Sequence, residues 1–315
     1  MADLKATLGF IGAGATGTAL ACSLYPKGYN VVAVNSRGPD SAARLASRVG
    51  GCRVCITPQQ VADLAQAVFI TTPDDIIETI AANLAWRPCQ VVIHCSGVHS
   101  VDILEHAHKY GAYICCLHPL QTFAGVEDAV SNIAGSTFAL EGDPEALDLA
   151  GCMAADLDGR LLTLRPGDKV LYHASAVTLS NYLVTLMKTA AGYWESFGIS
   201  RDKAVEFLLP LLKGTVRNIE RSGVPDALTG PIARGDVETV RKHIACLEAS
   251  HPETLDMYRT LGLETVSVAL ARGRLSLETA QEIRDLLGAP RHAGRQREIQ
   301  AELSSDDIND LMYRH

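Results

Sequence analysis

The stretch that decides the fold is Thr7-Leu8-Gly9-Phe10-Ile11-Gly12-Ala13-Gly14-Ala15-Thr16-Gly17-Thr18-Ala19-Leu20. An apolar run typical of a β-strand enters a Gly-x-Gly-x-x-Gly motif, and a run rich in Ala and Leu, typical of a helix, leaves it. The first glycine permits a tight turn, the second lets a pyrophosphate approach the backbone, and the third allows close packing of helix on strand. The first N–H groups of such a helix favour an anion. A dinucleotide site is therefore predicted at Gly12, Ala13, Gly14, Ala15, Thr16 and Gly17.

The second expected strand indicates which dinucleotide binds. It runs from Asn30 to Asn35 and is followed by Ser36 and Arg37, with no acidic residue at its end. NAD sites usually place Asp or Glu here to accept hydrogen bonds from the ribose hydroxyls, whereas a hydroxyl and a guanidinium suit a 2′-phosphate. The alternative is that Arg37 is an ordinary solvated loop residue. The pattern favours NADP(H).

Composition excludes several classes of protein. The chain has 315 residues, 47% of them hydrophobic, which is enough for two domains with substantial cores. Its net charge of −8 argues against nucleic acid or an anionic membrane as a partner. No apolar run approaches the length of a membrane span, and no secretory signal precedes the first strand, so a cytoplasmic location is expected. The nine cysteines are expected to be reduced, and the ten histidines lack metal-ligand spacing, so no metal is predicted.

The order of apolar runs predicts an α/β fold, with a Rossmann-type, mostly parallel sheet followed by an all-helical second domain. Strands alternate with helical stretches, which is typical of a parallel sheet covered on both faces. After the first two, the expected strands are 52–56, 67–71, 90–94, 113–117, 137–140 and 161–164. Residues 1–166 are predicted to form the NADP-binding domain. Long helical runs at 169–196, 201–222, 236–249, 252–271 and 275–287 predict a substrate and dimerisation domain over 167–290, and residues 291–315 are a polar tail.

Polar residues mark the ends of several expected strands. Because ligands bind at the carboxyl ends of parallel strands, we predict cofactor contacts from the residues that follow the fourth and fifth strands. His118, at the end of the sixth strand, is a weaker candidate, and Asp74 or Asp75 could simply cap the next helix. The residues predicted to contact cofactor here are Thr72, Pro73, Ser96 and Gly97.

One face of the first long helix mixes polar and apolar residues. At about 100° per residue, His173 shares its face with Val177, Ser180, Asn181, Val184 and Lys188. This mixture suits a helix that faces a polar cleft, and His173 and Asn181 are candidate catalytic residues. The alternative is a pair of buried polar side chains satisfied by backbone groups.

A turn-rich segment, Leu228-Thr229-Gly230-Pro231-Ile232-Ala233-Arg234-Gly235-Asp236, joins two expected helices. Arg234 could bind a substrate carboxylate in bidentate fashion, or it could form an ion pair within the domain. Asp236 is placed to cap the following helix.

Taken together, these motifs resemble one bacterial family, which joins a Rossmann-like domain to a helical domain of formerly unknown function. The resemblance covers about residues 5–270 and rests on the glycine motif, Ser96-Gly97, Leu117-His118-Pro119, Tyr172-His173-Ala174 with Asn181, and Thr229-Gly230-Pro231 with Arg234-Gly235-Asp236. That family is similar to ketopantoate reductase, pyrroline-5-carboxylate reductase and the 6-phosphogluconate and β-hydroxyacid dehydrogenases. The β-hydroxyacid dehydrogenases place a catalytic lysine on the first long helix of their second domain. In this chain His173 lies near the position of that lysine.

The resemblance implies an NADPH-dependent oxidoreductase that reduces a small 2-oxo acid, ketopantoate-like, in a cleft between the domains of a homodimer. In that interpretation His173 is the general acid, because imidazole titrates near neutral pH. Asn181 would hold the reacting oxygen, and Arg234 would hold the carboxylate. Two alternatives remain open. One is reduction of a cyclic imine such as a pyrroline carboxylate, and the other is a non-catalytic NADPH-binding sensor.

Overall fold

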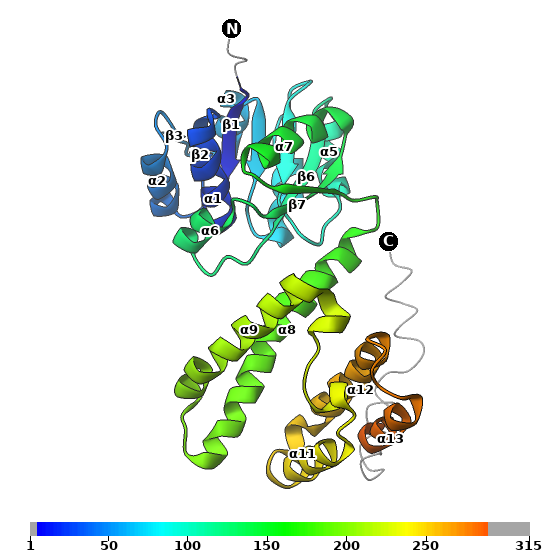
Figure 1. Ribbon diagram of the computed structural model, residues 1–315. Helices are drawn as coiled ribbons and strands as arrows, with labels where there is room; N and C mark the ends of the chain where they lie inside the picture. Colours follow the sequence, from blue (N-terminus) through cyan, green and yellow to red (C-terminus); the bar gives the residue numbers. More distant parts are fainter. Residues whose placement is uncertain (1–4, 289–315) are drawn as a thin grey trace, which may run out of the picture. The chain divides into compact units, whose positions relative to one another are not determined.

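The computed structural model describes residues 5–288, and its first part is built on one eight-stranded sheet (Figure 1). The strands lie in the order β3-β2-β1-β4-β5-β6-β7-β8. β1 to β6 are parallel to one another, whereas β7 pairs antiparallel with β6 and parallel with β8. The predicted Rossmann-type, mostly parallel sheet is thus confirmed. The bounds are β1 Thr7–Ile11, β2 Asn30–Asn35, β3 Arg53–Val54, β4 Ala67–Ile70, β5 Val91–His94, β6 Tyr113–Leu120, β7 Thr137–Gly142 and β8 Arg160–Thr163.

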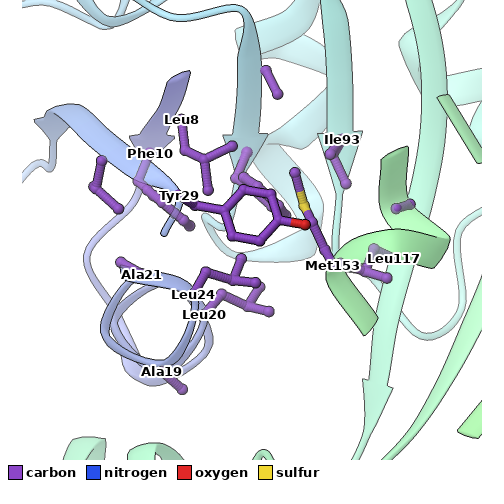
Figure 2. Close-up of a cluster of buried hydrophobic side chains, with 14 of the residues drawn as sticks. Leu8, Phe10, Ala19, Leu20, Ala21, Leu24, Tyr29, Ile93, Leu117 and Met153 are labelled. Atoms are coloured by element: carbon purple, nitrogen blue, oxygen red, sulfur yellow. The ribbon is translucent and has the colours of Figure 1, made fainter. Parts of the chain in front are cut away.

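Helices cover both faces of this sheet and divide its core into two clusters. The first cluster, shown in part in Figure 2, packs β1 side chains such as Phe10 against Leu20 of α1 and Met153 of α7, with Tyr29 among them. The second packs the other face of the strands on α3, α4 and α5. Burial on both faces explains the near-continuous apolar strands. The helices of the first face are α1 Ala15–Leu24, α2 Pro39–Arg48, α6 Val126–Asn132 and α7 Pro144–Asp156; those of the second are α3 Pro58–Leu64, α4 Ile77–Ala82 and α5 Glu105–Lys109.

The chain after β8 is helical, as predicted. Its core gathers Val240, Leu255, Val266 and Ile283 from three helices. The helices are α8 Lys169–Tyr193, α9 Arg201–Ala227, α10 Pro231–Arg234, α11 Val237–Ser250, α12 Leu255–Ala271 and α13 Leu277–Gly288. Short 3₁₀ segments lie at Tyr25–Lys27, Asp74–Ile76, Val101–Leu104, Trp194–Phe197 and Pro252–Thr254. None of the helices within residues 5–288 is long and apolar enough to cross a membrane.

Several details differ from the expectations. The strand predicted at 52–56 has only two residues in the structure, Arg53–Val54. The first long helix ends at Tyr193 rather than at 196. The second continues past 222 to Ala227 by way of a break at Gly223, whose φ of 75° suits glycine. The four-residue helix α10 was not expected. Asp236, by contrast, caps α11 as predicted, because its Oδ1 accepts the Thr239 N–H at 3.0 Å.

Contacts divide the chain into two compact units, and the division falls between Leu183 and Val184, inside α8. The first half of α8 therefore belongs with the sheet, where the side chain of Lys169 is buried. The predicted domain boundary at 166/167 marks the end of the last strand, whereas the division inside α8 follows the contacts between residues. The polar tail predicted at 291–315 lies outside the described residues.

Candidate active site

The glycine turn joins three strands at the point where the strand order reverses. Gly12 N donates to Asn35 O of β2 at 2.8 Å, and Thr71, next to β4, donates from its Oγ1 to Gly12 O at 2.8 Å. Gly12 has a φ of +111°, and a Cβ there would lie 2.6 Å from the Thr71 backbone. A Cβ on Gly17 would also collide with Thr71 and Gly12. Glycine is thus required at both positions for the two reasons inferred from the sequence.

The same turn has the properties of an anion site. Gly14 is exposed, and no atom lies within 4 Å of the place its Cβ would take. It is the N-cap of α1 and supplies no side-chain cap, so the first N–H groups of the helix have no side-chain acceptor at Gly14. Ser36 is half-buried and Arg37 exposed just beyond β2. These groups fit a pyrophosphate at the turn and a 2′-phosphate beside β2.

A series of contacts leads from the glycine turn along the strand ends to β5. Thr72 follows Thr71, and its Oγ1 is buried without a hydrogen-bond partner among the described residues. Asp74 starts a 3₁₀ turn and accepts from Ser96 Oγ at 2.9 Å. Ser96 Oγ also accepts the N–H of Val98 and His99. The side chain of Asp74 therefore holds the loop after β5, a role that the sequence did not indicate.

Gly97 lies beneath two imidazoles. A Cβ at Gly97 would lie 2.6 Å from His173 Nδ1 and 2.9 Å from His118 Nε2. His173 Nδ1 is buried and has no hydrogen-bond partner in the described chain. His118 Nδ1 lies 2.7 Å from the hydroxyl of Tyr172, with the two rings edge to face. The structure thus brings together the predicted residues Gly97 and His173 with the weaker candidate His118.

The two nitrogens of His118 have different roles. Burial, followed by the charges of Lys169 and His173, lowers the pKa of His118 to about 4, so this imidazole is neutral at pH 7. Burial also raises the pKa of Tyr172 above its usual range, so the phenol keeps its proton and can donate to Nδ1. In that tautomer the ring proton is on Nε2, the nitrogen next to Gly97. A neutral N–H donor suits a carbonyl or imine placed over this glycine.

Lys169 is the functional candidate that the sequence interpretation missed. It is the first residue of α8, one turn before His173, and only 2% exposed. Its Nζ donates to Ser96 O at 2.5 Å and lies 2.7 Å from Cys116 Sγ. The sequence contains one indication of this role: Lys169 lies four residues before His173, a spacing that places both side chains on one face of a helix.

Four of the six residues of the predicted helix face line one cavity. The cavity has a volume of about 350 Å³, and its wall includes His118 of β6 and, just after that strand, Gln121 and Thr122. Val184, in contrast, is 70% exposed and lies outside this wall. The residues of the face that line the cavity are His173, Val177, Ser180 and Asn181.

Arg234, the predicted carboxylate ligand, belongs to the second compact unit and is exposed at the end of α10. It follows Gly230, whose φ is 96°, and precedes Gly235, whose φ is 69°. The two glycines allow the chain to leave and re-enter helical geometry within five residues. No group of three or more His, Cys, Asp or Glu residues in the described chain is placed to hold a metal ion.

Two family models match the sequence. Residues 1–119 match a Rossmann-like domain, and residues 136–265 match a domain of unknown function, DUF2520. No curated protein matches the sequence significantly.

Solved structures share the fold over most of the chain. The Thermotoga maritima protein TM1727 is 27% identical with a TM-score of 0.67, and the match covers 85% of this chain and 100% of that one. A candidate NADP oxidoreductase from Bacteroides fragilis is 23% identical with a TM-score of 0.65, covering 86% and 99%. The 1-pyrroline-5-carboxylate reductase of Streptococcus pyogenes is 16% identical with a TM-score of 0.56, covering 90% and 100%. The chain thus joins a Rossmann-like domain to a DUF2520 domain, which confirms the resemblance inferred from its motifs.

Proposed function

We propose that this protein is an NADPH-dependent reductase of a small 2-oxo acid. The observation that carries the proposal is the line of contacts from the glycine turn, through Thr71 and the Asp74–Ser96 pair, to Gly97 beneath His118 and His173. A phosphate-binding turn and two convergent imidazoles thus lie along one edge of one sheet. This is the edge at which parallel α/β sheets bind cofactor and substrate. The similar fold of an NADP oxidoreductase supports the choice of cofactor.

Different residues are proposed to bind different parts of the cofactor. The turn at residues 12–17 binds the pyrophosphate, Ser36 and Arg37 bind the 2′-phosphate, and Thr72, Pro73, Ser96 and Gly97 contact the rest of the cofactor. NADPH, when bound, supplies the hydride.

The two imidazoles have separate tasks in the reduction. His118 is neutral and donates a hydrogen bond from Nε2 to the substrate oxygen, which favours the negative charge that develops there. His173 transfers the proton to that oxygen as general acid. Asn181 orients the reacting group, and Arg234 pairs with the substrate carboxylate.

Reduction of a cyclic imine is the second candidate, because the fold is also that of a pyrroline-5-carboxylate reductase. In that reaction the same donors meet a nitrogen rather than an oxygen. The proposed cavity wall contains hydroxyl, amide and imidazole groups, which can bind either atom.

The deciding experiment follows NADPH oxidation by the purified protein against a panel of 2-oxo acids and cyclic imino acids. We expect turnover with a 2-oxo acid, and a His173→Ala variant that melts like wild type and turns over ~10²–10⁴-fold more slowly. Asn181→Ala should lower turnover less, and Arg234→Ala should mainly raise KM. His106→Ala, on α5, is the matched control and should behave like wild type.

Other outcomes of the same panel would replace the proposal. Turnover of imino acids alone would favour the imine reductase, and tight NADPH binding without turnover of any compound would favour a sensor. Early melting of His173→Ala with normal turnover would place the catalytic site elsewhere.

The assembly proposed here is a homodimer formed by the helical part. The helices α8 and α9 expose large apolar side chains, among them Leu179 at 77%, Leu211 at 68% and Phe207 at 51%. We infer that these exposed apolar side chains take part in an interface, because large exposed apolar areas mark sites of association. A second copy of the chain is therefore one proposed partner, and the small carboxylate substrate is the other. The proposed location of the protein is the cytoplasm.

A further inference from the structure

Cys116 and Lys169 are buried side by side, and the proposed reaction does not use the thiol. Cys116 lies on β6 and is 0% exposed, and Lys169 opens α8. Lys169 Nζ is 2.7 Å from Cys116 Sγ. Both side chains also contact one backbone oxygen, Ser96 O, at 2.5 Å from Nζ and 3.4 Å from Sγ.

The nitrogen–sulfur distance is too short for an ordinary hydrogen bond. N–H···O bonds are usually about 2.9 Å long, and sulfur is a larger acceptor than oxygen, so an N–H···S bond should be longer. Other sulfur contacts in this protein behave normally: Cys115 Sγ is 3.8 Å from Ala146 O, and Cys55 Sγ is 3.8 Å from Arg53 O. A separation of 2.7 Å suits two atoms that are both bonded to one intervening atom.

We propose that Cys116 and Lys169 form a reversible covalent bridge through one oxygen atom, Sγ–O–Nζ, under oxidising conditions. The oxidant is dioxygen or hydrogen peroxide. With dioxygen, the Lys169 ammonium first releases one proton. An S–O and an N–O bond then form, the S–H bond and one N–H bond of the amine break, and the second oxygen leaves as water. Sulfur and nitrogen each lose two electrons, and dioxygen takes up all four. With peroxide, two molecules supply the same four-electron oxidation and three waters leave.

The surroundings of the thiol determine how it reacts. Burial raises the pKa of Cys116 to about 11, and the neighbouring Lys169 opposes this rise. The thiol is therefore protonated at neutral pH, and it is not a rapid peroxide scavenger, because the thiolate is the nucleophile. A sulfenic acid that forms at Cys116 holds its oxygen beside the Lys169 nitrogen without movement of the backbone, and the second two-electron oxidation joins that oxygen to the nitrogen. Direct attack of the amine on the sulfur would instead expel water and give an S–N sulfenamide.

The bridge would change the charge of the site. Nitrogen bonded to oxygen is much less basic than an alkyl amine, so the bridge removes the positive charge of Lys169. That charge helps to keep His118 and His94 neutral. The bridge would also fix the start of α8 to β6. An effect on turnover rests on the proposed function, whereas the bridge itself does not.

The test is the intact mass of the full-length protein after incubation with hydrogen peroxide, measured under denaturing conditions. The bridge adds one oxygen and removes two hydrogens, so we expect a gain of about 14 Da that dithiothreitol reverses. Peptide mapping should find the Cys116 and Lys169 peptides linked. Cys116→Ser and Lys169→Arg should each abolish the gain, whereas Cys115→Ala, at the adjacent buried position, should retain it.

Three outcomes would overturn the proposal. A loss of about 2 Da would indicate a disulfide, for which Cys95 is the candidate partner, or a direct S–N sulfenamide between Cys116 and Lys169, and gains of about 16 or 32 Da without a peptide link would indicate simple oxidation of the thiol. An unchanged mass would also refute it. If Lys169→Arg does not fold, the linked peptide in wild type and its absence in Cys116→Ser decide the question. These readouts are independent of turnover, so failure of the proposed function leaves them intact.

Discussion

Arg37 illustrates how one exposed side chain can set cofactor choice. It follows β2, where many dinucleotide sites carry an acid, and its guanidinium is exposed beside the half-buried Ser36. A phosphate oxygen pairs with a guanidinium through charge-assisted hydrogen bonds, which are stronger than neutral ones. Such a contact should act on NADPH and leave NADH, which lacks the phosphate, almost unaffected.

We therefore expect Arg37→Ala to weaken NADPH binding by about 1.5–3 kcal/mol, with little change for NADH. Titration calorimetry with both cofactors measures the difference directly. Arg160→Ala, on the strand at the other edge of the sheet, is the control and should bind both cofactors normally. Equal affinity of wild type for NADH and NADPH would refute the role of Arg37.

At the level of elements, β5 ends on the buried His94, and β6 carries the half-buried His118 two residues before its last residue, Leu120. Burial, with help from the charge of Lys169, lowers the pKa of His94 to about 3 and of His118 to about 4. His94 Nδ1 accepts the Ser96 N–H, while its Nε2 has no partner among the described residues. Protonation of either ring would place a second charge beside the Lys169 ammonium.

These pKa shifts predict that stability falls as the pH is lowered from about 6.5 toward 4. In that range the unfolded chain binds protons that the folded protein does not, so the free energy of unfolding drops by at most about 1.4 kcal/mol per pH unit for each histidine. His118→Gln keeps a hydrogen-bonding side chain but cannot titrate, and its stability should depend less steeply on pH. Urea unfolding at several pH values measures both slopes, and identical slopes would contradict the assignment.

At the level of the whole molecule, the apolar surface of α8 and α9 requires an explanation. Side chains such as Phe207, Leu211 and Ile219 are exposed on α9, although α11, α12 and α13 form a core of their own. An isolated chain would present this surface to water, and burial on association would recover about 25 cal/mol for each Å² removed.

The chain should therefore be a dimer by light scattering at micromolar concentration. Leu211→Glu, which places a charge in the middle of the proposed interface, should shift the equilibrium toward monomer. Leu277→Glu is the matched control, because Leu277 is also largely exposed, at 77% against 68% for Leu211, but lies on α13. A monomeric wild-type protein would rule out the proposed interface.

The fold could be predicted closely because its determinants are local. Gly12 and Gly17 are needed where the chain turns, apolar runs mark strands buried on both faces, and Asp236 caps its own helix. The short β3 and the continuation of α9 past Gly223 were not predicted, because both depend on neighbouring elements rather than on local preference.

The sequence interpretation names His173 as a catalytic candidate and Ser96 as a cofactor contact. It does not name Lys169, because a lysine at the start of a helix ordinarily lies in water. Its burial against Ser96 and Cys116 depends on residues 73 and 53 positions away. The same applies to Asp74, whose partner Ser96 lies in the loop after β5, 22 residues along the chain.

The sequence by itself determined the class of fold, the glycine turn and the kind of cofactor that the turn suits, since each depends on backbone geometry within a few residues. Only the tertiary structure decided which side chains meet. The ends of β5 and β6 and the first turn of α8 are brought together by sheet order, which places Gly97 beneath His118 and His173 and excludes water from Lys169. Burial and neighbouring charge then alter the chemistry of these groups, and neither property exists in an extended chain.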